Sequence, residues 1–206
     1  MTISNNPFLI RQKTLTQIEN PSLEQWVFHV AENGLLQADF LQTNASLSIR
    51  VYLEGNSAKC ELNCCYLVNN NNMINIDIQV IHEAGNTTSS QQIRGLVTDQ
   101  ADINFTGTIT IPYDSQKCDG HQNHRGIVLS DNASISATPQ LEIWADDVKC
   151  AHGSAIGPLD KEQLFYLQTR GISESEAKKL LLSSFFSDLM PTEFNPLIED
   201  WIAHHV

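Results

Sequence analysis

Short stretches in which every second residue is apolar fill the chain from about residue 35 to residue 158. This alternation constrains the fold more than any other feature, because successive side chains of a β-strand point to opposite faces and only one face then enters a core. Clusters of turn-forming residues separate the stretches, and no helical periodicity of useful length interrupts them before Leu159. The alternating stretches are Ala45–Leu53, Ile74–Val80, Ile103–Phe105, Ile109–Ile111 and Leu141–Ile143.

Many short strands, polar turns and an aromatic content of only 7% favour an all-β architecture. The pattern alone leaves a sandwich, a barrel and a β-solenoid open. We expect a lead-in segment over residues 1–34, a β core over residues 35–158 and a helical subdomain over residues 159–206.

The periodicity changes to that of helices after Gly157. Asp160 can cap a first helix that Gly171 ends, and the sequence from Ser173 to Glu176 is a capping box that opens a second helix, ended by Pro191. The second helix has more apolar surface than a helix exposed on all sides carries, so we expect it to pack on the β core, on a partner, or on both. Its apolar residues are Leu180, Leu181, Leu182, Phe185, Phe186 and Leu189.

Composition excludes several classes of function. The net charge is −12, from 24 acidic and 12 basic residues, and such a surface repels the phosphate backbone of nucleic acids. No apolar run reaches the roughly 18 residues that a membrane span requires, and the N-terminus lacks the pattern of a secretory signal, so we expect a cytoplasmic protein. The five cysteines form no disulfide-scaffold pattern and are expected to be free thiols or metal ligands.

The turn after residue 143 holds the first candidate metal ligands. The imidazole of His152 suits iron, although a histidine at a strand-to-turn corner can also serve only as a hydrogen-bonding group. Cys150 lies on the same face as His152 if the backbone is extended, and it is either a second ligand or an ordinary core thiol.

A second cluster has the spacing Cys-x-x-His-x-x-His, from Cys118 through His121 to His124, in a segment rich in turn residues. These donors could reach one metal ion, or they could belong to a polar loop. Cys60, Cys64 and Cys65 lie in a strand-like apolar context, where adjacent residues face opposite sides, and we expect them to pack in the core. His204 and His205, at the end of the chain, are expected to be frayed and solvated.

Residues 139–172 resemble a known family. They contain P-x-L-E-I-x-A-D-D-V-K-C-x-H-G from Pro139 to Gly153, G-x-L-D from Gly157 to Asp160, and L-F-Y-L-x-x-R-G-I from Leu164 to Ile172. This is the signature of the SufD branch of the SufB/SufD family, the scaffold subunits of the Suf iron–sulfur cluster assembly machinery. Thr88–Val97 is similar to another segment of the family, and the likeness covers about residues 82–190.

The resemblance implies a right-handed parallel β-helix followed by the helical subdomain. It implies that His152 lies at an interface with a SufB-like subunit, where a transient iron–sulfur cluster forms, and that no cofactor is bound stably by the chain alone. His124 is similar in position to a ligand cysteine of the SufB paralogue, so His152, Cys150 and His124 are the expected metal residues.

The family also implies partners. The resemblance implies that the helix from Ser173 to Leu189 docks the SufC-like ATPase. The sequence contains no P-loop, so any ATP hydrolysis is expected to belong to that partner. The chain is expected to form a homodimer when it is alone. Most of the N-terminal helical region that family members usually carry is expected to be missing.

Two other classes of function stay open beside a non-catalytic scaffold. One is a shortened interaction module that binds the ATPase or itself without building a cluster. The other is a carbohydrate-active β-helix enzyme, but the low aromatic content and the absence of carboxylate clusters on the strands disfavour it.

Overall fold

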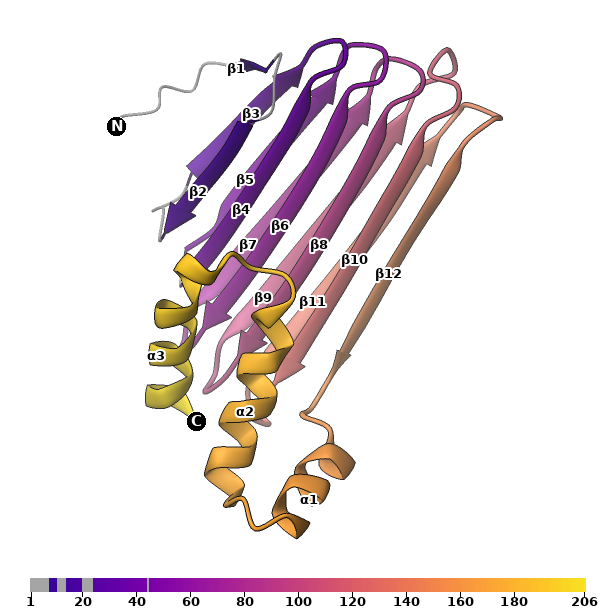
Figure 1. Cartoon of the computed structure of the whole chain (residues 1–206). Helices are drawn as coiled ribbons and strands as arrows, with labels where there is room; N and C mark the ends of the chain where they lie inside the picture. Colours follow the sequence, from indigo (N-terminus) through magenta and orange to yellow (C-terminus); the bar gives the residue numbers. More distant parts are fainter. Residues whose placement is uncertain (1–7, 11–13, 20–23, 44) are drawn as a thin grey trace.

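A computed structural model describes residues 8–10, 14–19, 24–43 and 45–206. Its body is a flattened parallel β-helix made of two six-stranded sheets that face each other (Figure 1). Every strand pair is parallel, and consecutive strands of the chain alternate between the two sheets. The predicted parallel β-helix is therefore confirmed.

The two sheets contain the odd-numbered and the even-numbered strands respectively. The first sheet consists of β1 (Phe8–Ile10), β3 (Glu24–Val30), β5 (Leu47–Leu53), β7 (Met73–His82), β9 (Asp102–Ile111) and β11 (Ser134–Ile143). The second consists of β2 (Thr14–Glu19), β4 (Leu35–Thr43), β6 (Lys59–Val68), β8 (Thr88–Val97), β10 (Asp119–Val128) and β12 (Lys149–Gly157).

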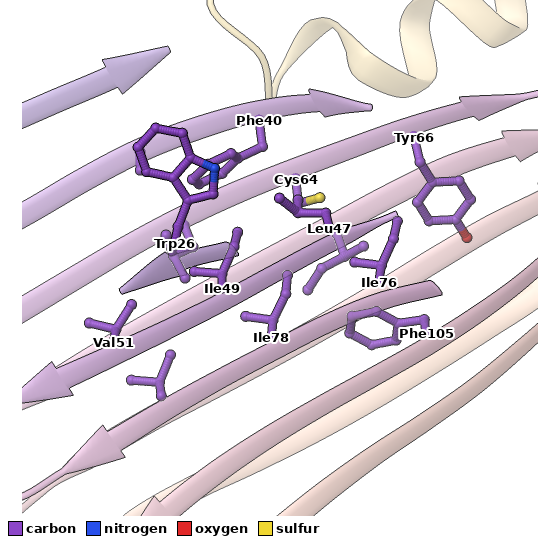
Figure 2. Close-up of a cluster of buried hydrophobic side chains, with 14 of the residues drawn as sticks. Trp26, Phe40, Leu47, Ile49, Val51, Cys64, Tyr66, Ile76, Ile78 and Phe105 are labelled. Carbon is purple, nitrogen blue, oxygen red and sulfur yellow. The ribbon is translucent and has the colours of Figure 1, made fainter. Parts of the chain in front are cut away.

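The core between the sheets follows from the register. Equivalent residues of neighbouring strands pair directly, as Leu62 of β6 does with Gln91 of β8, so inward side chains stack in columns along the β-helix. In the first strands these columns are aliphatic and aromatic, and Figure 2 shows Ile49, Ile78 and Phe105 among them. The alternation that predicted the strands is therefore the alternation between this core and the outer faces.

Three helices follow the last strand: α1 (Lys161–Thr169), α2 (Glu174–Ser187) and α3 (Asn195–His205), with the 3₁₀ turn η1 (Thr192–Phe194) before α3. The predicted caps are confirmed. Asp160 accepts hydrogen bonds from the first-turn amides of α1, and the side chains of Ser173 and Glu176 form the capping box of α2.

The helices α2 and α3 cover part of the outer face of the second sheet (Figure 1). Cys65 faces outward into this second core, whereas its neighbour Cys64 faces inward. Both thiols are fully buried, as expected, and burial raises the pKa of Cys64 to about 12. The second core consists of Leu41, Cys65, Leu67, Leu96, Leu182, Phe186, Met190, Phe194, Ile198, Trp201 and Ile202.

One arginine ties α2 to the sheet. The guanidinium of Arg94 on β8 donates to the carbonyl of Phe185 and to both carboxylate oxygens of Asp188, and it lies 5.5 Å from the centre of the Phe185 ring. The pKa of Asp188 is lowered, first by the hydrogen bonds from Arg94. This contact fixes the C-terminal end of α2 on β8.

The structure differs from the sequence predictions at both ends. The strand β3 already pairs with β5 along its whole length, so the β-helix includes strands before residue 35. The expectation that His205 is frayed and solvated is wrong. His205 stacks on Trp201 in α3, at 4.6 Å between ring centres, and its Nε2 accepts a hydrogen bond of 2.6 Å from Asn69.

Gly95 on β8 leaves room for the ring of Tyr66, which lies in the interior directly beside it. A Cβ atom at residue 95 would lie 1.8 Å from that ring, whereas one at Gly157 would meet nothing within 4 Å. We predict that Gly95→Ala lowers the free energy of unfolding by about 1–3 kcal/mol, the usual cost of overpacking. Urea denaturation measures this change. Equal stability of Gly95→Ala and the control Gly157→Ala would contradict the packing described.

Candidate functional site

The β-helix has an open end at its last strands. The strands β11 and β12 are the terminal strands of their sheets, and no further strand of the described chain pairs with them. The inward positions of β12 are consequently much more exposed than those of the strands before it. The register pairs Cys150, His152, Ser154 and Ile156 with Gly120, Gln122, His124 and Gly126 of β10, all four of which are buried.

His152 lies in the middle of this open end. Its side chain is exposed, and no hydrogen bond or ion pair involves it within the described part of the chain. Cys150, two residues before, points inward, because a Cβ atom at Gly120 would lie 3.4 Å from its sulfur. The two candidate ligands therefore share one face of an exposed edge strand, as the extended backbone predicts.

Cys150 is only half-buried. Burial raises the pKa of its thiol, a hydrogen bond from the backbone of Gly120 lowers it, and the net shift is upward. The thiolate, which is the form that binds iron, is thus disfavoured in the free chain. A nearby cation, such as a metal ion, would favour the thiolate.

The third candidate, His124, is held in the interior. Its ring nitrogens lie 2.9 Å from the hydroxyl of Tyr66 and 2.9 Å from the hydroxyl of Ser154, and its ring stacks on Phe105 at 4.8 Å. Burial lowers its pKa to about 4, so the ring is neutral at physiological pH. Because both nitrogens are already hydrogen-bonded, His124 could bind a metal only if one of these bonds were broken.

A second buried histidine lies in the interior at the end of strand β7. His82 of β7 is fully buried, with its ring nitrogens 2.8 Å from the hydroxyl of Thr87 and 2.9 Å from that of Ser89. Cys118 lies beside them, its sulfur 3.2 Å from the Thr87 hydroxyl. Neither His82 nor this arrangement was found from the sequence, since the alternation gives a strand residue's face and not its neighbours on the other sheet.

The cluster expected from the Cys-x-x-His-x-x-His spacing does not assemble. The segment is not a turn-rich loop but leads directly into strand β10, where alternation turns His124 inward and leaves His121 exposed beside Asp119. Among the described residues, no group of three or more His, Cys, Asp or Glu side chains is placed to hold a metal ion.

In two columns of the second sheet the inward side chains become polar toward the open end. Leu62 on β6 is followed in register by Gln91, Gln122 and His152 on the next three strands, and Ile93 is followed by His124 and Ser154. In these two columns aliphatic side chains thus give way to polar ones, whereas the inward side chains of β11 in the first sheet stay apolar.

The helical subdomain presents a second surface. Of the residues expected to bind a partner, Leu182 and Phe186 are fully buried against the sheet, Leu181, Phe185 and Leu189 are half-buried, and Ser173 is exposed at the cap. The most exposed apolar side chains of the subdomain belong to α1 and to the outer face of α2. They are Phe165, Tyr166 and Leu180, which are 67%, 57% and 54% exposed.

A hollow of about 510 Å³ lies beside Leu180. Gly171, Ile172, Glu176, Lys179, Leu180 and Ser183 line it, so it spans the turn between α1 and α2. No residue of α1 is buried, and α1 contacts mainly α2. The part of the subdomain farthest from the second core is therefore the part with the most free apolar surface.

These features define a parallel β-helix protein with an uncovered end, which carries both polar and apolar side chains, and a helical appendage. The family model for the SUF system FeS cluster assembly, SufBD core domain, matches residues 27–185. The chain belongs to this family, and the resemblance found in the sequence is confirmed.

The chain is similar to several curated proteins. It is 31% identical over 171 residues to the iron–sulfur cluster assembly protein SufD of Escherichia coli, which covers 78% of this chain and 40% of that protein. It is 32% identical over 116 residues to SufD of Bacillus subtilis (56% of this chain, 26% of that protein) and 39% identical over 102 residues to protein ABCI7, chloroplastic, of Arabidopsis thaliana (50% and 22%). The chain therefore spans less than half the length of these relatives.

None of the helices in the described residues is both long and apolar enough to cross a membrane.

The two buried histidines make stability depend on pH. Burial lowers the pKa of His82 and of His124 to about 4, whereas an unfolded histidine has a pKa of about 6.5. Between these values the unfolded chain takes up protons that the folded chain does not, so each histidine lowers stability by about 1.4 kcal/mol per pH unit as the pH falls. We predict that His124→Gln reduces the dependence of the free energy of unfolding on pH by about 1.4 kcal/mol per pH unit, the contribution of one histidine.

Urea denaturation of both proteins at a series of pH values from about 7 to about 4.5 measures the two slopes. The comparison uses slopes rather than absolute stabilities, because the substitution also removes hydrogen bonds. The same slope in both proteins would show that His124 is protonated in the folded state.

Proposed function

We propose that this chain is a scaffold subunit of the Suf system, on whose open β-helix end a nascent iron–sulfur cluster forms together with a SufB-like subunit. The observation that carries the proposal is the position of the Lys-Cys-x-His-Gly motif. Its histidine lies on the terminal strand of the β-helix, exposed and without a hydrogen bond among the described residues. A cluster shared between subunits needs only one or two ligands from each side, and His152 and Cys150 can supply them.

The open end also supports pairing between subunits. The unpaired backbone groups of β11 and β12 and the half-exposed inward residues Ile135, Ala137 and Ile156 form a surface that a second β-helix can cover. A SufB-like subunit is the proposed partner in the complex, and a second copy of this chain takes its place in a homodimer when SufB is absent.

A SufC-like ATPase is proposed to dock on the helical subdomain. The hollow beside Leu180, with Phe165 and Tyr166 on α1, is the apolar surface that α1 and α2 leave free. Nucleotide-driven movement of the ATPase would act on α2, whose other end Arg94 fixes to β8. The chain itself is proposed to be non-catalytic. An interaction module that binds the ATPase without building a cluster is the second candidate, and it predicts docking without any need for His152.

We predict that His152→Ala lowers the iron and sulfide content of the reconstituted complex at least about tenfold, because the chain would lose its most accessible ligand. Iron and acid-labile sulfide are assayed after anaerobic reconstitution with the host's SufB and SufC. His121→Ala is the matched control, since His121 is exposed on the outer face of the neighbouring strand. A complex that keeps its cluster after His152→Ala would favour the interaction module.

We predict that Leu180→Asp weakens binding of the SufC-like ATPase at least about tenfold, because a charge would be desolvated in the centre of the apolar surface. Leu197→Asp on α3 is the control, since Leu197 is 40% exposed on a different helix. Biolayer interferometry with the purified ATPase measures both affinities. Equal losses in the two variants would place the docking surface elsewhere.

A further inference from the structure

A chain of side-chain hydrogen bonds, here called the relay, joins the interior to the open end of the β-helix. The hydroxyl of Tyr66 on β6 lies 2.9 Å from Nε2 of His124 on β10, and Nδ1 of the same ring lies 2.9 Å from the hydroxyl of Ser154 on β12. Tyr66 and His124 are both 0% exposed, whereas Ser154 is exposed on the terminal strand. The relay therefore begins in the closed interior and ends at the surface that carries His152.

Two glycines allow the tyrosine to reach β10. Tyr66 pairs in register with Gly95 of β8, and Gly95 pairs with Gly126 of β10. A Cβ atom at Gly95 would lie 1.8 Å from the Tyr66 ring, and one at Gly126 would lie 3.3 Å from its hydroxyl oxygen. The ring thus fills space that side chains of β8 and β10 would otherwise occupy. Phe105 of the opposite sheet stacks on the imidazole of His124 at 4.8 Å and holds its plane.

The buried end of the relay fixes the direction of its hydrogen bonds. Within the described residues, Nε2 of His124 is the only hydrogen-bond partner of the Tyr66 hydroxyl, and burial raises the pKa of this hydroxyl, so it keeps its proton. A buried O–H group that donated to nothing would lose its hydration without compensation. Tyr66 therefore donates to Nε2, which must be the unprotonated nitrogen of the neutral ring. The ring proton is then on Nδ1, and Nδ1 donates to the oxygen of Ser154.

The hydroxyl proton of Ser154 is consequently left for an acceptor at the open end. His124 is the only hydrogen-bond partner of this hydroxyl in the part of the chain that the structure describes, and there the serine oxygen accepts. Ser154 follows His152 by two residues on the same face of β12, which is about 6.6 Å along an extended strand. The sulfur atoms of an iron–sulfur cluster are acceptors of this kind, and hydrogen bonds to them help to set the reduction potential.

We propose that Ser154 is a further residue of the assembly site, which donates its hydroxyl proton to a sulfur of the nascent cluster, and that Tyr66 and His124 are positioning residues that fix this donor. The part directed at the cluster rests on the proposed function. The direction of the hydrogen bonds in the relay does not, since its three members are hydrogen-bonded in the chain alone.

The tautomer of His124 tests the direction of the relay. In the chain alone, labelled with ¹⁵N-histidine at a pH of about 8, where an ordinary histidine is neutral, ¹⁵N chemical shifts report which ring nitrogen carries the proton. The His124 signals are assigned by their loss in His124→Gln. We expect the Nδ1–H tautomer to predominate in the wild-type chain. A predominant Nε2–H tautomer would overturn the inference.

Tyr66→Phe and Ser154→Ala form a matched pair. Tyr66→Phe removes the donor that fixes the imidazole and keeps the aromatic ring, so we expect the Nδ1–H tautomer of His124 no longer to predominate. Ser154→Ala removes the other hydroxyl and leaves Tyr66 in place, so we expect this tautomer to persist. An unchanged tautomer in Tyr66→Phe, or the same change in both variants, would overturn the role of Tyr66. If Tyr66→Phe does not fold, the tautomer of the wild-type chain decides the question.

The reduction potential of the cluster tests the donor. In the cluster-loaded complex with the SufB-like subunit, redox titration should give a lower potential for Ser154→Ala than for the wild type, because a hydrogen bond to sulfur stabilises the more negative, reduced cluster. Ser154→Thr keeps a hydroxyl and should restore the wild-type potential. Loss of the cluster in Ser154→Ala but not in Ser154→Thr would support the same role.

Equal potentials in the wild type and Ser154→Ala, or the same change in the alanine and threonine variants, would overturn the role of Ser154 toward the cluster. A wild-type complex that holds no cluster would contradict the proposed function and this second half with it. The tautomer of His124 would still decide whether Tyr66 and His124 direct the serine hydroxyl outward.

Discussion

The in-register stacking of parallel strands is the constraint on which the rest of this structure depends. Each strand pairs residue for residue with the one before it, so a side chain's chemical surroundings are set by the equivalent residues of its neighbours. Strand pairing holds this arrangement on both sides of each inner strand and on one side of each terminal strand of the described chain. Columns of the second sheet can therefore change from aliphatic to polar residues, as from Leu62 to His152, while the strand pairing continues.

The regular stacking ends at β12, where inward side chains become exposed. Inward residues of β12 have a neighbour on one side only, so His152 occupies an interior position and is nevertheless exposed. The buried histidines of the preceding strands are neutral and saturated with hydrogen bonds to hydroxyl groups. The same residue type is thus buried and hydrogen-bonded on β10, and exposed without a side-chain hydrogen bond on β12, within the described residues.

The helical subdomain divides its apolar residues between two tasks. Leu182 and Phe186 are buried against the outer face of the second sheet, and the burial of each side chain stabilises the fold by about 1.5–3 kcal/mol. Arg94 holds the C-terminal end of α2 on the same sheet. Leu180 and the exposed aromatic residues of α1 make no such contribution to the fold. Exposed apolar groups that lie together are typical of surfaces that bind a partner.

The sequence by itself determined the features that depend on local order along the chain. Alternation predicted the strands, capping residues predicted α1 and α2, and the motif from Pro139 to Gly153 identified the family. The helix α3 was missed, although Phe194, Ile198, Trp201 and Ile202 have helical spacing. Only the tertiary structure decided that His124 is buried and His152 exposed, and that Gln122 follows Gln91 in one column. These contacts join residues about 30 or more positions apart or across two sheets, and their geometry follows from strand register, which no local pattern contains.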